Sequence, residues 1–194
     1  ASAYIRGMKS AGMAGTLKHW PGDGVDERDQ HLVTSNNTLT MEEWRNTFGR
    51  IYEKLISQGI KTIMSAHITL PAYDRELNPD IPVSDILPAS INPRLNNNLL
   101  RNELGFNGLI ISDATIMAGL TSQGPRNVIL PMVIQNGCDM MLFTENTFTD
   151  ISYLYTAYQL GRISKERLDT AVVRVLGFKA SLGLHRKTVK DILN

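Results

Sequence analysis

Acids and histidines gather in one short stretch of this 194-residue chain. Residues 18–31 read KHWPGDGVDERDQH and hold two histidines, four acids, two cations and a Pro-Gly-x-Gly turn. The stretch directly follows an apolar run that is typical of a buried strand. A packed core does not tolerate this many charges, whereas the open mouth of an active site, at the end of a sheet, needs titratable groups. Residues 18–31 therefore indicate a site at the end of a strand.

The triplet Asp29-Gln30-His31 has the sharpest chemical pattern in this stretch. An acid two residues from a histidine can accept a hydrogen bond from one ring nitrogen and so orient the ring. The other ring nitrogen is then free to transfer a proton, which is the logic of general acid/base catalysis. The D-x-H pattern is also common in plain surface loops, so the residues alone leave both interpretations open.

Lys18 and His19 end the first apolar strand. Adjacent side chains point to opposite faces of a regular strand, so both reach one ligand only if the backbone twists there. The alternative is a lysine in solvent and a histidine bonded to a backbone carbonyl. Residues 21–24, Pro-Gly-Asp-Gly, predict a turn that acts as a hinge for the loop after it.

Two more polar residues end apolar strands further along the chain. Asp113 follows Ile-Ile-Ser and is either a functional carboxylate or the N-cap of the next helix. His67 ends IKTIMSAH and is a structural histidine, a ligand contact or a metal ligand. A metal-dependent hydrolase with His19, His31, His67 and nearby acids as ligands is a further alternative, although the spacing matches no familiar zinc pattern.

The composition is that of an ordinary globular protein, with 42% hydrophobic and 20% charged residues and a formal charge of +1. No basic stripe is present, so we expect no nucleic-acid partner. Cys138 is the single cysteine and excludes an internal disulfide. No apolar run approaches the roughly 20 residues of a membrane span. We expect a cytoplasmic protein.

Four short apolar runs predict strands, at residues 14–19, 60–66, 109–112 and 138–143. Continuously apolar strands are typical of parallel strands that are buried on both faces. Helices are predicted between and after them, over residues 2–11, 41–58, 93–104, 125–135, 148–160 and 165–182. This alternation predicts an α/β fold.

The helix that begins at residue 41 has the clearest start and face. Thr40 and Glu43 form a predicted capping box. Apolar residues then recur at steps of three and four and predict one buried face, which consists of Met41, Trp44, Phe48, Ile51 and Leu55.

Polar residues cluster after the predicted strand ends, at Lys18, His19, His67, Asp113, Thr144 and Glu145. Catalytic groups at the carboxyl ends of parallel strands are the habit of (β/α)₈ (TIM) barrels. A complete barrel takes about 250 residues and eight strands, and this chain has four predicted strands. We therefore predict half of such a barrel.

Taken in order, these motifs resemble one family. KHWPGDG followed by DQH resembles the K-H-F-P-G-x-G…D-x-H signature of glycoside hydrolase family 3, and most closely its β-N-acetylhexosaminidase branch. The signature often has His where this chain has Asp23. The resemblance covers almost the whole chain, through MSAHITLPAYD, PASINPRLNNNLLRNELGFNGLIISDATIMAGL, GCDMMLF and GRISKERLDTAVVRVLGFKASLGL.

The resemblance implies retaining hydrolysis of β-linked N-acetylglucosamine from peptidoglycan- or chitin-derived oligosaccharides. Asp113 matches the nucleophile, His31 the acid/base and Asp29 its dyad partner. Lys18 and His19 match residues that bind the hydroxyls and the N-acetyl group of the sugar, and we assign His67 to substrate binding as well. The family uses no metal or organic cofactor, so we expect none.

The resemblance also implies that residues 1–194 are a single partial domain, the C-terminal half of the catalytic barrel. The chain begins in the helix before the family's fifth strand, so we expect the N-terminal half as its partner. Two unpaired sheet edges and an open core are expected without it. A β-glucosidase, a glycoside phosphorylase and an inactive or merely sugar-binding fragment remain alternatives, and the P-G-x-G and D-x-H elements argue against the first.

Overall fold

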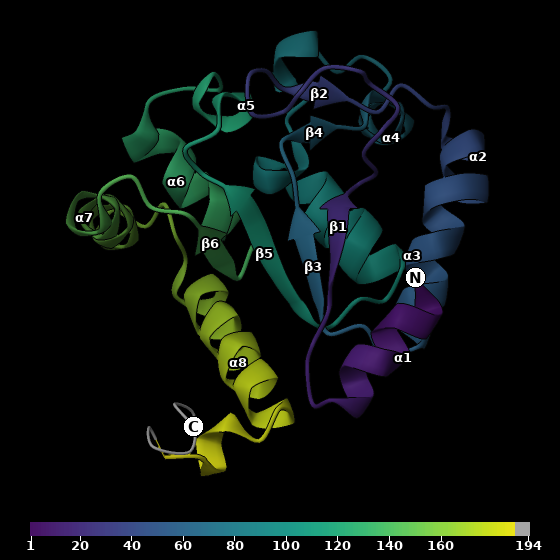
Figure 1. Cartoon of the computed structure of the whole chain (residues 1–194). Helices are drawn as coiled ribbons and strands as arrows, with labels where there is room; N and C mark the ends of the chain where they lie inside the picture. Colours follow the sequence, from purple (N-terminus) through teal and green to yellow (C-terminus); the bar gives the residue numbers. More distant parts are fainter. Residues whose placement is uncertain (189–194) are drawn as a thin grey trace.

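The structure is a computed structural model that describes residues 1–188. Its centre is a four-stranded sheet in the order β1-β3-β5-β6, in which every neighbouring pair is parallel (Figure 1). The strands are β1 (Thr16–Trp20), β3 (Thr62–Ser65), β5 (Leu109–Ala114) and β6 (Met140–Leu142). The predicted α/β fold with four parallel strands is confirmed.

Helices lie before, between and after the strands. They are α1 (Ser2–Ser10), α2 (Met41–Trp44), the π-helical turn η1 (Arg45–Gly49), α3 (Arg50–Ser57), α4 (Pro71–Leu77), the π-helix η4 (Arg94–Glu103), α5 (Ala118–Thr121), α6 (Arg126–Gln135), α7 (Thr147–Gln159) and α8 (Lys165–Ser181). Three 3₁₀ turns complete the set: η2 (Val83–Asp85), η3 (Ala89–Ile91) and η5 (Leu184–Arg186).

Two short strands that the sequence did not predict lie beyond the carboxyl end of the sheet. They are β2 (Ser35–Asn36) and β4 (Ile68–Thr69), and they pair in parallel. β2 ends the loop that follows β1, and β4 follows β3 at once. The pair therefore ties the loop that contains the acidic stretch to the next β/α unit (Figure 1).

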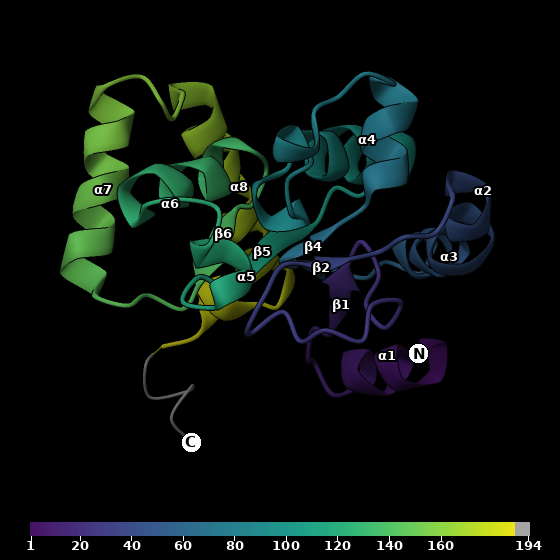
Figure 2. The same ribbon diagram turned by 90° about the horizontal axis from the view of Figure 1, so that it is seen from above.

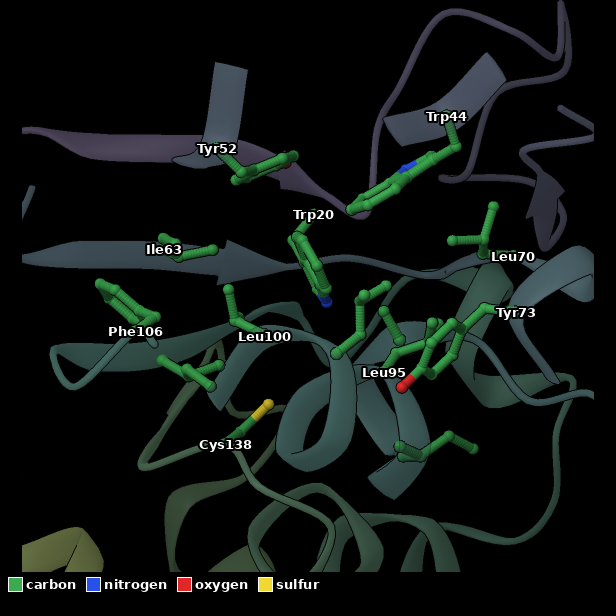
Figure 3. Packing of buried hydrophobic residues seen from close by; sticks show 14 of the residues in the cluster. Trp20, Trp44, Tyr52, Ile63, Leu70, Tyr73, Leu95, Leu100, Phe106 and Cys138 are labelled. Carbon is green, nitrogen blue, oxygen red and sulfur yellow. The ribbon is translucent and has the colours of Figure 1, made fainter. Parts of the chain in front are cut away.

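The helices gather round one side of the curved sheet (Figure 2). Trp20 is fully buried there and makes edge contacts with Trp44 at 5.7 Å and with Tyr52 at 4.7 Å between ring centroids (Figure 3). Such aromatic pairs contribute about 0.5–1.5 kcal/mol beyond the area they bury. This aromatic cluster fixes the end of β1 against α2 and α3, directly beneath the candidate site.

The predicted capping box of α2 is present, since Thr40 Oγ1 accepts from the Glu43 N–H and the Glu43 carboxylate accepts from the Thr40 N–H. The predicted buried face is wrong at Ile51, which is 50% exposed, while Tyr52 is buried. The π-helical turn η1 explains the difference, because each π turn takes up an extra residue and rotates the following face.

The amino end of the sheet is closed by a buried ion cluster around Asp139. Its carboxylate is fully buried and lies 2.6 Å from Arg101, 2.7 Å from Arg167 and 3.3 Å from Arg174. It also accepts a hydrogen bond from the Ile110 N–H at 2.9 Å. Asp139 thereby joins β5, η4 and α8 at the end opposite the candidate site.

β1 and β6 are the edge strands of the sheet, and within residues 1–188 nothing pairs with their outer sides. The face of the sheet turned away from the helices carries half-buried apolar side chains, namely Met64, Ile111, Met140 and Leu142. This is the arrangement of four consecutive β/α units of a (β/α)₈ barrel. In the same described part, no helix is long and apolar enough to cross a membrane.

Candidate active site

An irregularity in β1 turns Lys18 and His19 to the same side. Leu17 pairs with Ile63 and Trp20 with Ser65, so β1 uses one residue more than β3 over this interval. Leu17 and Trp20 both pack into the core beneath the helices. The two residues between them are therefore turned away from that core. This is the twist of the backbone that both side chains need in order to reach one ligand.

His19 lies between two carboxylates at the carboxyl end of the sheet. Its Nδ1 is 2.9 Å from Asp23 Oδ2, and its Nε2 is 3.8 Å from Asp113 Oδ2. The bond to Asp23 fixes the ring and directs Nε2 at Asp113. The acid that replaces the usual histidine of the signature is thus the orienting partner of His19.

Asp113 lies inside β5, and its side chain is 13% exposed. Its Oδ1 accepts a hydrogen bond from the Ala114 N–H at 2.7 Å. The next helix, α5, begins at Ala118 with Met117 as N-cap, so Asp113 does not cap it. No lysine or arginine among the described residues forms an ion pair with Asp113. Oδ2 is therefore left for a ligand at the mouth, with His19 as its neighbour.

Asp29 and His31 form the predicted pair. His31 Nδ1 lies 2.6 Å from Asp29 Oδ1, and the same oxygen accepts the His31 backbone N–H at 2.9 Å. These two bonds, the backbone one first, hold the pKa of Asp29 below its ordinary value, so the carboxylate stays ionised. Both side chains are exposed, and in the described part of the chain Nε2 of His31 has no partner. That nitrogen is free to exchange a proton with a ligand.

The loop with this pair rests on α5, the helix that follows Asp113. The His31 carbonyl accepts from the Ala118 N–H at 3.0 Å, and Thr34 Oγ1 donates to the Gly119 carbonyl at 2.7 Å. The chain runs from Asp113 to α5 in a few residues. These two hydrogen bonds to α5 therefore hold His31 at the same end of the sheet as the Asp113 carboxylate. The structure thus places His19, Asp29, His31 and Asp113 at the carboxyl end of the sheet, and Lys18 is exposed beside His19 in β1.

His67 is fully buried beneath this mouth. Its Nδ1 is 2.8 Å from Ser90 Oγ and its Nε2 is 3.0 Å from the Ala114 carbonyl. Burial lowers the pKa of His67, opposed by the Ala114 carbonyl and by the charge of Asp113, and so favours the neutral ring. Both ring nitrogens are occupied, and this arrangement does not support the direct sugar contact assigned from the sequence. His67 instead holds the residue next to Asp113.

Sequence reasoning missed Gln30 and Ser90. Gln30 is buried and its side chain bonds to the His67 N–H and to Asp23, while Ser90 binds the His67 ring. Neither residue type signals this from spacing alone. The described residues contain no group of three or more His, Cys, Asp or Glu side chains that could hold a metal ion.

Comparisons with known proteins identify the family of the chain. Residues 1–178 match the glycosyl hydrolase family 3 N terminal domain. A β-N-acetylglucosaminidase/β-glucosidase of Cellulomonas fimi is 52% identical over 95% of this chain and 33% of its own length. A β-hexosaminidase of Stenotrophomonas maltophilia (strain K279a) is 33% identical over 86% of this chain and 49% of its own length.

Solved structures show the same fold. The β-glucoside phosphorylase BglX superposes with a TM-score of 0.95 and 48% identity, over 97% of this chain and 34% of its own. A glycoside hydrolase family 3 β-N-acetylglucosaminidase from Paenibacillus sp. str. FPU-7 superposes with a TM-score of 0.85 and 27% identity, over 97% of this chain and 35% of its own. The chain belongs to glycoside hydrolase family 3, and it spans between a third and a half of these relatives' lengths.

Proposed function

We propose that the site performs retaining hydrolysis of β-linked N-acetylglucosamine from peptidoglycan- or chitin-derived oligosaccharides. The observation that supports this most strongly is the pairing of an accessible carboxylate, Asp113, with an oriented histidine, His31, on a loop that rests on the helix following that carboxylate. Two such groups are what a two-step glycosidase needs.

In the first step an oxygen of Asp113 attacks the anomeric carbon while the bond from that carbon to the leaving oxygen breaks. Nε2–H of His31 gives its proton to the leaving oxygen. The ionised Asp29 carboxylate stabilises the imidazolium before this transfer and holds the ring in one orientation. The product of this step is a glycosyl ester of Asp113.

In the second step His31 takes a proton from water, and the water oxygen attacks the anomeric carbon. The ester bond breaks, and Asp113 is released as a carboxylate. Lys18 and His19 contact the hydroxyls and the N-acetyl group of the sugar throughout. The two steps use these side chains and water, so no cofactor is required.

A chromogenic N-acetylglucosaminide, compared with the matching β-glucoside in the full-length protein, tests the substrate. Faster release from the N-acetylglucosaminide supports the proposal. Turnover of the β-glucoside alone would favour the β-glucosidase alternative. The Cellulomonas fimi relative, which is named for both activities, supports testing it.

Phosphorolysis is a second candidate, because the acid/base is a histidine. A carboxylate base would repel an incoming phosphate dianion, whereas an imidazole does not. The 48% identical neighbour named as a β-glucoside phosphorylase supports this alternative. Rates with and without inorganic phosphate decide it: a sugar 1-phosphate product indicates phosphorolysis, and free sugar at an unchanged rate indicates hydrolysis.

We also propose that residues 1–194 are one partial domain, which the N-terminal half of the barrel completes along β1 and β6. The open edges and the half-buried inner face of the sheet support this. Assaying the chain with and without that half tests it, and equal activity of the chain alone would contradict it. A fragment that binds sugar without turnover is the non-catalytic alternative. The cytoplasmic location remains a prediction, which cell fractionation would check.

A further inference from the structure

Gln30 is the middle residue of Asp29-Gln30-His31, and its side chain is turned inward while its neighbours face solvent. Gln30 is 7% exposed, whereas the side chains of Asp29 and His31 are 58% and 70% exposed. A buried amide costs free energy unless it is hydrogen-bonded. The bonds of Gln30 therefore show which parts of the site it joins.

The amide of Gln30 links two histidines. Its Oε1 accepts the backbone N–H of the buried His67 at 3.1 Å, and its Nε2 makes a long contact of 3.5 Å with Asp23 Oδ2. The same oxygen of Asp23 is bound to His19 Nδ1. One side chain thus connects the fixed His67 with the Asp23–His19 pair that faces the nucleophile.

The backbone of Gln30 is held from the opposite side. Its carbonyl accepts the Gly119 N–H at 3.2 Å. A Cβ at Gly119 would lie 2.5 Å from that carbonyl oxygen and 2.9 Å from His67 Cβ, so only glycine permits this approach. Gln30 therefore joins the loop to both α5 and His67, directly beside the His31 carbonyl that binds the Ala118 N–H.

We propose that Gln30 is a positioning residue that sets His31 at its working distance from Asp113. This role rests on the proposed function, since it concerns the proton donor of that reaction. The Asp29–His31 bond is local and survives loss of the amide. The exposed dyad makes no other side-chain bond in residues 1–188, so its distance from Asp113 depends on the loop. Gln30 holds that loop to His67, in addition to the bonds of the His31 carbonyl and Thr34 to α5. Proton transfer is therefore the step that Gln30 controls.

The test is Gln30→Met in the full-length protein, which keeps the shape of the side chain and removes the amide. Two N-acetylglucosaminides that differ only in the leaving group are compared by kcat/KM, which reports the first step. Phenol needs a proton to leave, whereas dinitrophenol does not. We expect a loss of about 10- to 100-fold with the phenyl substrate and less than about threefold with the dinitrophenyl substrate.

Gln58→Met is the matched control, because Gln58 is exposed at the end of α3 and far from the mouth in sequence. It leaves both rates unchanged. Equal losses with the two substrates in Gln30→Met, or no loss, would overturn the positioning role.

Two further variants replace Gln30→Met in this test if Gln30→Met is unfolded at the assay temperature. Gly119→Ala pushes the loop away from α5 and is expected to give the same leaving-group dependence. Gln30→Glu keeps the acceptor for the His67 N–H but sets a carboxylate against Asp23, and we expect a loss that is again larger with the phenyl substrate. Uniform losses in these variants contradict the role. A wild-type protein that turns over neither substrate would instead overturn the proposed function.

Discussion

Asp113 and Asp139 lie at opposite ends of two neighbouring strands, and their surroundings are opposite as well. Asp139 is fully buried at the amino end, where three arginines and a backbone N–H satisfy it. Asp113 is partly open at the carboxyl end and has one histidine at 3.8 Å. A buried carboxylate with every partner supplied is fixed in place and holds the fold together. A carboxylate with a partner missing is free to react.

The largest effect expected from this contrast is the loss of activity in Asp113→Asn. An amide cannot form the glycosyl ester, so kcat/KM for an N-acetylglucosaminide falls on the order of 10⁴-fold or more. The free energy of unfolding stays within about 0.5 kcal/mol of wild type, because no close ion pair is lost. Initial rates and urea denaturation measure the two quantities. Undiminished turnover would remove Asp113 from the nucleophile role.

The second effect is the loss of stability in Asp139→Asn. Arg101 and Arg167 are left as buried cations without their counter-ion, which costs about 3–5 kcal/mol. Burial already lowers the pKa of Arg101 to about 10, opposed by Asp139. Urea denaturation checks this, with Asp169→Asn on the exposed side of α8 as control. A midpoint equal to that of the control would show that the arginine cluster is dispensable.

The third effect distinguishes Asp29 from the nucleophile Asp113. Asp29→Asn keeps a hydrogen-bonding side chain but removes the charge that stabilises the His31 imidazolium. We expect kcat/KM to fall about 10²- to 10³-fold for a substrate with a poor leaving group. Asp26→Asn, in the same loop and paired with Arg28, is the control. Circular dichroism spectra that match wild type exclude loss through misfolding, and an unchanged rate would contradict the dyad.

The sequence predicts the fold well where one local signal decides it. The four parallel strands follow from apolar runs of the right length, and the α2 cap follows from Thr40 and Glu43. The buried face of α2 and α3 fails at Ile51, because a π-helical turn changes the period and nothing in the apolar spacing announces it.

The sequence predicts which residues belong to the candidate site, but only some of the hydrogen bonds between them. The pairing of Asp29 with His31 is local, so a spacing of two suffices to find it. The roles of His67 and Gln30 depend on residues far away in sequence, Ser90, Ala114 and Gly119, which come together only after the sheet has formed. Long-range hydrogen bonds of this kind leave no local pattern.

The fourth prediction extends the comparison to two uncharged groups in one aromatic cluster. Trp44 Nε1 donates to the Pro21 carbonyl at 2.7 Å, whereas Trp20 Nε1 is buried with no hydrogen-bond partner among residues 1–188. Trp44→Phe loses ring volume and a buried hydrogen bond and leaves the carbonyl unsatisfied. Trp20→Phe loses the same volume but removes an unsatisfied N–H. We expect Trp44→Phe to be less stable than Trp20→Phe by about 1–3 kcal/mol in urea denaturation. Equal losses would show that the indole N–H groups do not decide stability here.

The fifth and smallest effect concerns His67, which lies at the reactive end of the sheet but is satisfied like Asp139. Burial lowers its pKa in the folded protein below the ordinary value of 6.5, which applies to the unfolded chain. Below pH 6.5 the unfolded chain therefore binds a proton that the folded protein does not. The free energy of unfolding then falls with decreasing pH, by at most about 1.4 kcal/mol per pH unit from this group, until the folded pKa is reached. Unfolding measured at pH 7 and pH 5.5 detects this in wild type and in His185→Gln, whose histidine is exposed. In His67→Gln this component of the pH dependence is absent, and a slope unchanged from wild type would mean that His67 is protonated equally in both states.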